Sequence, residues 1–193
     1  MINGWKENLE KFKFIIVVSL DYQRAFETID RELFILKAQK YGFSENSLKW
    51  FTSYLKERKQ KTKINEKVSE EIANEIKIPQ GAVLSCLMFI IFINDIKMAV
   101  KYSSLNLFAD DSTLPFACNN IEDGIIKINH DLNSIFEWTF ANKLSLNVTK
   151  TKVMIIAPRS KNFCEICENH KKKILKLTKN QSNLWTKSNF LDL

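Results

Sequence analysis

The segment NLFADDSTL, residues 106–114, sets two aspartates side by side between two apolar runs. Short apolar runs on either side of a polar turn predict a hairpin of antiparallel strands. Two adjacent like charges in such a turn have two explanations. Asp and Ser favour turns and are solvated there, or the turn presents both carboxylates to a cation. The nonapeptide by itself leaves both explanations open.

A third aspartate, Asp21, directly follows the segment FKFIIVVSL, residues 12–20. This segment is rich in β-branched and aromatic residues. This composition predicts a buried strand. A carboxylate at the end of a buried strand is costly unless a cation meets it. If this strand lies beside a strand at 105–109, three carboxylates converge, and a divalent cation is the usual resolution of such a cluster. The alternative is a solvated turn and an unrelated strand-end aspartate.

The remaining periodicities predict a mixed chain of short strands and helices. Helical spacing of apolar residues predicts helices at 30–43, 45–58 and 121–141, and a helix at 82–100 that is apolar nearly all round and therefore buried. Short strands are expected as a pair within 59–78, and at 143–147 and 151–157. Strands gathered in hairpins with helices between them predict an α+β fold, an antiparallel sheet with helices packed on one face.

The composition is that of a globular protein, with 45% hydrophobic and 26% charged residues. The net charge is +7, and most of the excess lies in residues 159–193. A basic balance indicates polyanion partners, although a lysine-rich tail is also commonly just solvated. The longest apolar run, residues 82–93, is shorter than the roughly 20 residues of a membrane span. We expect a soluble, intracellular protein with no membrane partner, without a choice between nucleus and cytoplasm.

The four cysteines fall into two kinds. Cys86 and Cys118 lie in apolar surroundings and are predicted to be buried. Cys164 and Cys167 form a CxxC with His170 three residues on, which is half of a zinc site at most because a fourth ligand is missing.

Four segments in order resemble the palm of a reverse transcriptase of the non-LTR (LINE-type) retrotransposon group. VVSLDYQRAFETID resembles its first catalytic motif, and FADDSTL matches its F/Y-x-D-D box. IPQGAVLSCLMFIIFINDI resembles its Pro-Gln-Gly motif, and WTFANKLSLNVTKTKVMII resembles the segment that follows the aspartate pair. The resemblance runs from about residue 12 to residue 157, and it is the order and spacing of the motifs that make it specific.

The resemblance implies an RNA-directed DNA polymerase with two Mg²⁺ ions, or Mn²⁺ in their place. Asp21 and Asp110 would be the main ligands of both ions, and Asp111 a more peripheral ligand. Lys150 is the candidate for the cation near the leaving pyrophosphate, with Lys152 as its competitor; both could equally be solvated lysines at a strand edge.

The resemblance also implies a nucleotide site. Phe26 would be the steric gate under the sugar, where a ring leaves no room for a 2′-hydroxyl. Gln80 and Gly81 would line the site, and Arg24 would face the triphosphate or be a surface charge. No Ser-His-Asp or Cys-His set is present in the sequence, and phosphoryl transfer requires none.

Several basic residues lie between the first catalytic motif and the Pro-Gln-Gly motif. Lys59, Lys61 and Lys63 would form a phosphate track for an RNA template and a DNA primer, with dNTPs as the other substrates. The alternative is a solvated strand edge that the charges protect. No protein partner is indicated.

The sequence departs from the family pattern in several places. Glu27 stands where the family usually has Asp, and Ser85 and Cys86 replace a Gly-Pro pair. We expect a palm at 1–158 with partial fingers at about 31–79, a basic tail at 159–193 and no complete thumb, as in a fragment of a retroelement polyprotein. Two alternatives remain, an inactive relic or domesticated nucleic-acid-binding palm, and a small basic RNA-binding module without catalysis.

Overall fold

The computed structural model describes residues 7–8, 11, 14–26, 28–56, 59–73 and 83–157. They divide into two compact units. The first takes in the described parts of 1–23, 95–141 and 145–193, and the second takes in those of 24–94 with 142–144. The two units are described separately below.

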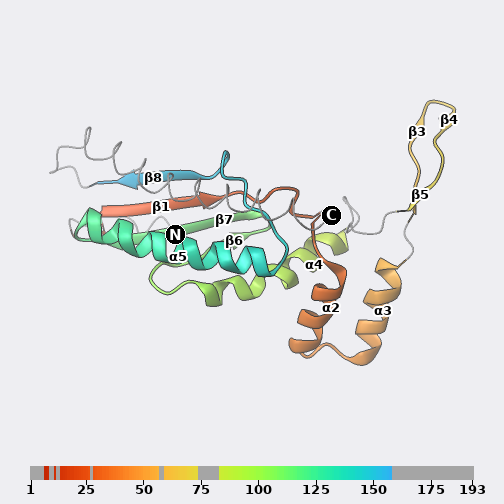
Figure 1. Cartoon of the computed structure of the whole chain (residues 1–193), viewed down its shortest axis with the longest axis horizontal. Helices are drawn as coiled ribbons and strands as arrows, with labels where there is room; N and C mark the ends of the chain where they lie inside the picture. Colours follow the sequence, from red (N-terminus) through yellow and green to blue (C-terminus); the bar gives the residue numbers. More distant parts are fainter. Residues whose placement is uncertain are drawn as a thin grey trace, which may run out of the picture. The chain divides into compact units, whose positions relative to one another are not determined.

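The first unit is built on an antiparallel sheet of four strands in the order β6-β7-β1-β8 (Figure 1). The strands are β1 (Phe14–Leu20), β6 (Asn106–Phe108), β7 (Asp111–Cys118) and β8 (Lys152–Ile156). The central place of β1 follows from its composition, because five successive apolar residues, Phe14–Val18, are buried. A buried strand must pair its backbone N–H and C=O groups along both edges, and β7 and β8 supply these partners.

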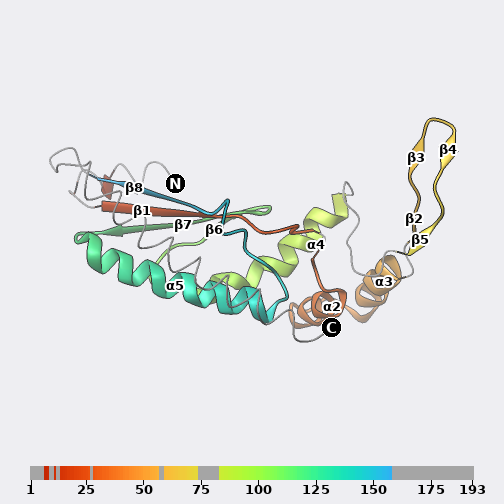
Figure 2. The same cartoon turned by 45° about the horizontal axis from the view of Figure 1, so that its top comes forward.

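One long helix, α5 (Ile121–Ala141), lies along one face of this sheet (Figure 2). Its buried residues recur at helical spacing, as in Ile121, Ile125, Ile128 and Leu132. The helix begins after Asn120, whose side-chain oxygen accepts a hydrogen bond from the Glu122 N–H at 2.8 Å. The predicted helix at 121–141 is confirmed with the same bounds.

Gly124 allows α5 to approach the sheet closely. A Cβ added there would lie 2.4 Å from Cys118 Sγ and 3.1 Å from Ile16 Cδ1. The first distance is far inside a van der Waals contact, so the side chain of Cys118 would have to shift. Gly124 therefore fills a position that helix propensity alone would give to Ala.

We expect Gly124→Ala to destabilise the first unit. Overpacking a tight contact costs about 1–3 kcal/mol, which exceeds the gain of roughly 1 kcal/mol in helix propensity. The measurement is a urea denaturation midpoint. Combining Gly124→Ala with Cys118→Ala removes the closest atom and should recover much of the loss relative to Cys118→Ala alone. A Gly124→Ala variant as stable as the wild type would show that the contact is not tight.

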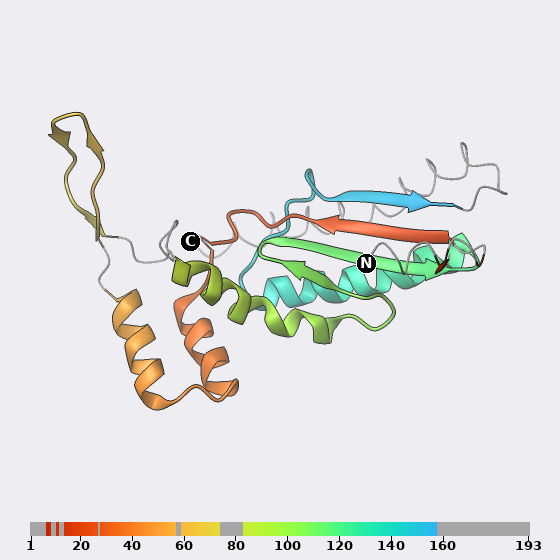
Figure 3. The ribbon, with the colours of Figure 1, turned by 180° about the vertical axis from the view of Figure 1, so that it is seen from behind.

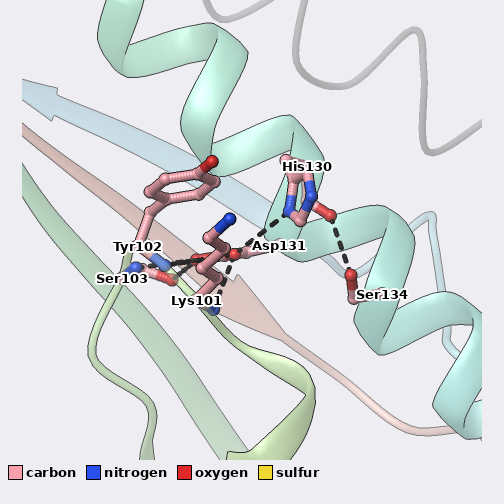
Figure 4. Close-up of polar contacts among 6 residues, drawn as sticks. All are labelled: Lys101, Tyr102, Ser103, His130, Asp131 and Ser134. Atoms are coloured by element: carbon pink, nitrogen blue, oxygen red, sulfur yellow. Dashed lines mark hydrogen bonds and ion pairs between the residues drawn. The ribbon is translucent and has the colours of Figure 1, made fainter.

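Asp131 anchors the chain segment before β6 to the middle of α5 (Figure 4). Its side chain is 0% exposed. Oδ1 accepts from the Lys101 N–H at 2.9 Å, and Oδ2 accepts from the Tyr102 N–H at 3.0 Å and from the Ser103 N–H at 2.7 Å. The Ser103 hydroxyl donates to Oδ2 at 2.6 Å. One buried carboxylate thus satisfies three successive backbone donors of residues 101–103.

The surroundings of Asp131 favour its charged form. Burial alone would raise the pKa of this carboxyl, but the hydrogen bonds from Ser103, Lys101 and Tyr102 outweigh it and hold the pKa below the usual value. The exposed His130 is adjacent, with Nδ1 3.6 Å from Asp131 Oδ1, and its ring meets the Tyr102 ring edge-on at 5.2 Å.

Three helices form the body of the second unit, namely α2 (Arg31–Lys40), α3 (Glu45–Leu55) and α4 (Val83–Ile93). Asp30 and Ser44 cap α2 and α3 by accepting from the backbone N–H groups of Leu33 and Ser47. Phe34 and Phe51 pack edge to face between these two helices, with ring centroids 5.1 Å apart.

Helix α4 is tied to α2 and leads into a 3₁₀ helix. The Lys37 ammonium donates to the Phe92 carbonyl at 2.9 Å and lies 4.7 Å from the centroid of the Phe92 ring. The 3₁₀ helix η1 (Asn94–Ala99) follows along the chain. Lys143, which follows α5, pairs with the Asp30 carboxylate, so residues 142–144 belong to the second unit.

A narrow two-stranded ribbon completes the second unit (Figure 3). It consists of β2 (Lys59–Gln60) paired with β5 (Ile72–Ala73), and β3 (Lys63–Ile64) paired with β4 (Lys67–Val68). Asn65, with a φ of 54°, and Glu66 form the turn. The expected pair of short strands with a turn near residue 66 is therefore confirmed for the described part of 59–78.

One condition stated for the site is not met, and two expectations about the fold are wrong. The strand at 12–20 does not lie beside the strand at 105–109, because β7 lies between β1 and β6. The apolar helix α4 is not buried all round, since Leu87 is 49% and Ile90 50% exposed, and Cys86 is exposed as well. Residues 143–147 form no strand; only a single bridge joins Leu146 to Tyr22. The α+β class, the antiparallel sheet and the buried Cys118 are confirmed.

None of the helices in the described part of the chain is long and apolar enough to cross a membrane.

Candidate active site

Asp21 directly follows the last residue of β1, and backbone hydrogen bonds join residues 21–23 to residues 145–147. The carbonyl of Asp21 accepts from the Asn147 N–H at 2.7 Å, and the Gln23 N–H donates to the Ser145 carbonyl at 2.8 Å. The bridge of Tyr22 with Leu146 lies between these two bonds. Asp21 is therefore positioned by main-chain pairing beyond the end of β1.

Asp110 and Asp111 stand in the connection of β6 to β7. Phe108 pairs with Asp111, so Ala109 and Asp110 form a two-residue hairpin turn. Ala109 has a φ of 51°, which matches the positive φ that hairpin turns of this length use and which costs an L-residue about 1–2 kcal/mol. Both aspartates are exposed. The strained turn thus presents one carboxylate at its tip and one at the first position of β7.

The register brings Asp21 and Asp111 to neighbouring positions. Leu20 of β1 pairs with Ser112 of β7, and one step further along both chains the same register sets Asp21 opposite Asp111. Directly opposed residues in an antiparallel pair have Cβ atoms about 4.5–5.5 Å apart. The convergence of three carboxylates stays a prediction. The pairing of β1 with β7 brings the chain positions of Asp21 and Asp111 together, and Asp110 stands in the adjoining turn.

Strand alternation gives the face on which the two carboxylates lie. Ile16 and Cys118 point toward α5, because a Cβ on Gly124 would meet both. Even-numbered residues of β1 and β7 share that face, since even residues pair with even ones. The odd-numbered Asp21 and Asp111 consequently belong to the face that α5 does not cover.

The donor set suits a hard divalent cation. Carboxylate oxygens are the ligands that Mg²⁺ and Mn²⁺ prefer. No group of three metal-ligating side chains is preassembled among the residues that the structure describes. Mg²⁺ is commonly bound by one or two carboxylates together with substrate phosphates rather than by an all-protein cage. Asp21 with Asp110 or Asp111 could hold such an ion once phosphates supply the other ligands.

Asn147 links the candidate lysine to Asp21. Besides donating to Asp21, Asn147 accepts at its carbonyl from the N–H groups of Lys150 and Thr151, at 3.1 and 2.9 Å. Its side-chain oxygen accepts from the Thr149 hydroxyl at 2.6 Å. The turn that carries the exposed Lys150 is thus attached to the backbone of Asp21. Asn147 was not among the predicted site residues, although Asn is a residue type that favours turns.

The competing lysine, Lys152, is placed by the sheet. It stands on β8 opposite Ser19 of β1, so it belongs, like Asp21, to the face of the sheet opposite α5. It is also exposed. Both lysines therefore remain candidates for the cation near a leaving pyrophosphate.

The other predicted nucleotide-site residues belong to the second unit or lie outside the described residues. Phe26 is half-buried, and its ring packs on Phe89 of α4 with centroids 5.1 Å apart. Arg24 is exposed in a turn, with a φ of 48°. Gln80 and Gly81 lie outside the described residues, as do residues 158–193 with the CxxC segment.

The predicted phosphate track lies on the two-stranded ribbon. Lys59, Lys61 and Lys63 are all exposed. Lys59 and Lys61 both pair with Glu71, at 3.0 and 3.4 Å. The carboxylate of Glu71 offsets part of the positive charge on this ribbon, and exposed pairs of this kind contribute little to stability.

An antiparallel sheet that is covered by a helix on one face and carries strand-end aspartates on the other is the architecture of a polymerase palm. Comparison with known proteins identifies the family. The family model described as reverse transcriptase (RNA-dependent DNA polymerase) matches residues 6–184, and the chain belongs to this family of nucleotidyltransferases.

The other comparisons concern individual proteins. No curated protein matches the chain. Among solved structures, apo telomerase from Candida tropicalis, truncated from its C-terminal domain, is similar, with a TM-score of 0.58 and 15% sequence identity. The match covers 83% of this chain and 35% of that chain, so this chain spans about a third of the telomerase structure. At this identity the likeness shows the fold alone, and it agrees with a partial palm.

Proposed function

We propose that this chain is the catalytic palm of an RNA-directed DNA polymerase from a non-LTR (LINE-type) retrotransposon. The observation that carries the proposal is the pairing of Leu20 of β1 with Ser112 of β7, which brings Asp21, the residue after β1, near Asp111 and the strained Ala109–Asp110 turn. The retrotransposon subtype rests on the four motifs of the sequence. The telomerase likeness, at 15% identity, does not decide between subtypes.

The proposed reaction is attack of a primer 3′-hydroxyl on the α-phosphate of a dNTP, with loss of pyrophosphate. Phosphoryl transfer requires mainly positioning and charge stabilisation from the protein. Two bound Mg²⁺ or Mn²⁺ ions would supply the charge that stabilises the attacking and leaving oxygens. Asp21 and Asp110 would hold them, and Asp111 would contribute a further negative charge at the edge of the site.

The remaining residues take positioning roles in this proposal. Lys150 or Lys152 would neutralise the leaving pyrophosphate, and Lys150 could donate a proton to it. Gln80, Gly81 and Arg24 would contact the incoming nucleotide. Lys59, Lys61 and Lys63 would follow the phosphates of the RNA template and DNA primer. We also propose residues 1–158 as the palm, with residues 31–79 serving as partial fingers and 159–193 forming a basic tail.

Primer extension by the purified chain tests the proposed function. With an RNA template, a DNA primer, dNTPs and Mg²⁺, we expect extension that EDTA abolishes and that added Mg²⁺ or Mn²⁺ restores, because the carboxylates act through bound cations. Template and primer binding is measured in parallel by fluorescence anisotropy. Binding without extension under any metal would contradict the proposed activity and would favour a palm that only binds nucleic acid.

Phe26→Val is expected to relax sugar selection. A smaller side chain at the gate position leaves room for a 2′-hydroxyl, and a pocket distinguishes one missing group by about 1–3 kcal/mol, or tenfold to two-hundredfold. The measurement is the ratio of kcat/KM for dNTP and the matching rNTP. Leu36→Val, at an exposed position of α2, is the control and should leave the ratio unchanged. An unaltered ratio in Phe26→Val would remove Phe26 from the gate.

A further inference from the structure

Each of the two opposed aspartates is followed by a buried hydroxyl-bearing residue. Tyr22 follows Asp21 and is 7% exposed, and Ser112 follows Asp111 and is 0% exposed. The Ser112 hydroxyl donates to the Tyr22 phenol oxygen at 3.3 Å. The two side chains come from residues 90 positions apart in the chain, so only the folded sheet brings them together.

The hydrogen bond lies on the opposite side of the sheet from the carboxylates. Tyr22 and Ser112 are even-numbered and belong to the face that α5 covers, whereas Asp21 and Asp111 belong to the other face. A bond between Tyr22 and Ser112 therefore joins the two strand ends directly beneath the aspartates. Rotation or separation of either strand end would change the spacing of the carboxylates and would break this bond.

The chemistry of the pair favours a positioning role over simple core filling. Phe and Ala would fill the same space without polar atoms, and a buried hydroxyl is unfavourable unless it is hydrogen-bonded. Burial raises the pKa of Tyr22 to about 12, although the hydrogen bond with Ser112 lowers it somewhat.

We propose that Tyr22 and Ser112 are positioning residues that fix the spacing of Asp21 and Asp111 for a divalent cation. The inference rests on the proposed function, because it assigns the aspartates to metal binding. Outer-shell groups that hydrogen-bond metal ligands directly change metal affinity by about tenfold to a hundredfold when they are removed. Tyr22 and Ser112 act on the aspartates through the backbone, so we expect the lower end of this range.

Mn²⁺ binding to the full chain at a fixed concentration of a dNTP tests the inference without depending on catalysis. It is measured by electron paramagnetic resonance of the free ion, against the same dNTP without protein. The variants are Tyr22→Phe and Ser112→Ala, each of which removes one hydroxyl, and their combination. We expect each single variant to raise the Kd for Mn²⁺ about tenfold. We expect the double variant to be no worse than the weaker-binding single variant, because all three lose the same bond.

Thr139→Val is the matched control. Thr139 is a buried residue of α5 whose hydroxyl donates to the Phe136 carbonyl at 2.8 Å, and the substitution likewise removes one buried hydroxyl. It should lower the urea midpoint while leaving the Mn²⁺ Kd at the wild-type value. The same Kd in Tyr22→Phe and in the wild type would overturn the positioning role, even if Tyr22→Phe were less stable.

Asp21→Asn separates failure of this inference from failure of the proposed function. If Asp21→Asn loses Mn²⁺ binding and Tyr22→Phe does not, the aspartates bind metal and only the positioning role is wrong. If Asp21→Asn binds Mn²⁺ as the wild type does, the aspartates are not the metal ligands, and both proposals are overturned.

Discussion

Asp110→Asn is expected to abolish templated nucleotide incorporation while leaving the fold intact. The substitution keeps the size of the side chain but removes the negative charge that would be shared by the bound cations. Metal-assisted charge stabilisation is worth several kcal/mol, and each 1.36 kcal/mol is a factor of ten in rate, so we expect a loss of about a thousandfold or more. The measurement is the initial rate of primer extension on an RNA template.

The stability of Asp110→Asn must be measured beside its activity. Asp110 is exposed in a turn, and exposed substitutions away from special features usually change stability by less than about 0.5 kcal/mol. Glu137→Gln, an exposed carboxylate on α5, is the matched control and should retain full activity. Full activity in Asp110→Asn, with wild-type stability, would eliminate the proposed two-metal mechanism.

Asp131→Ala is expected to be the most destabilising single substitution in the first unit. It removes the acceptor of three backbone N–H groups and one hydroxyl. Hydrogen bonds to a charged group contribute about 1.5–3 kcal/mol each, and buried donors left without an acceptor cost about 1–3 kcal/mol each. Because these terms overlap, we expect a total loss of about 3–5 kcal/mol, measured by urea denaturation.

The effect of Asp131 should depend on pH in a defined direction. The folded-state pKa of Asp131 lies below its usual value, so the unfolded chain binds the proton more tightly and this carboxylate stabilises the fold above the unfolded pKa of about 3.9. Its contribution is lost as the pH falls through the folded pKa. The stability difference between the wild type and Asp131→Asn should therefore shrink when the pH is lowered from 7 to below 4.

Asp123→Asn provides the control for Asp131. Asp123 is on the same helix but is half exposed, and it pairs with Lys127 four residues on. Such an exposed pair contributes little to stability, because water and salt screen it. A loss in Asp131→Ala no larger than that in Asp123→Asn would show that the 101–103 segment is held by other contacts.

The local elements of the first unit could be predicted because short-range patterns decide them. The apolar spacing of residues 121–141 fixed a helix with the observed bounds, and β-branched residues marked β1. The pair of aspartates between two apolar runs marked the β6–β7 hairpin. The order of motifs, read along the chain, was enough to indicate the reverse transcriptase family.

The mispredictions concern packing between distant segments. Cys86 and α4 read as buried because their neighbours in sequence are apolar, yet burial depends on what else covers the helix. The predicted strand at 143–147 shows the same limit. This segment has no strand partner beyond the single bridge from Leu146 to Tyr22 among the described residues. Hydropathy describes what a side chain prefers, whereas exposure is decided by residues elsewhere in the chain.

The sequence by itself determined the elements and the residue types of the candidate site, namely a strand ending in Asp21 and a turn carrying Asp110 and Asp111. Only the tertiary structure decided the strand order, which places β7 beside β1 and so sets Asp111 opposite Asp21. In the sequence, Asp131 is one of several charged residues on an amphipathic helix. Only the tertiary structure made it the buried carboxylate that accepts hydrogen bonds from the backbone N–H groups of residues 101–103. The physical reason is that register and burial arise from contacts between residues far apart in the chain, which no local spacing records.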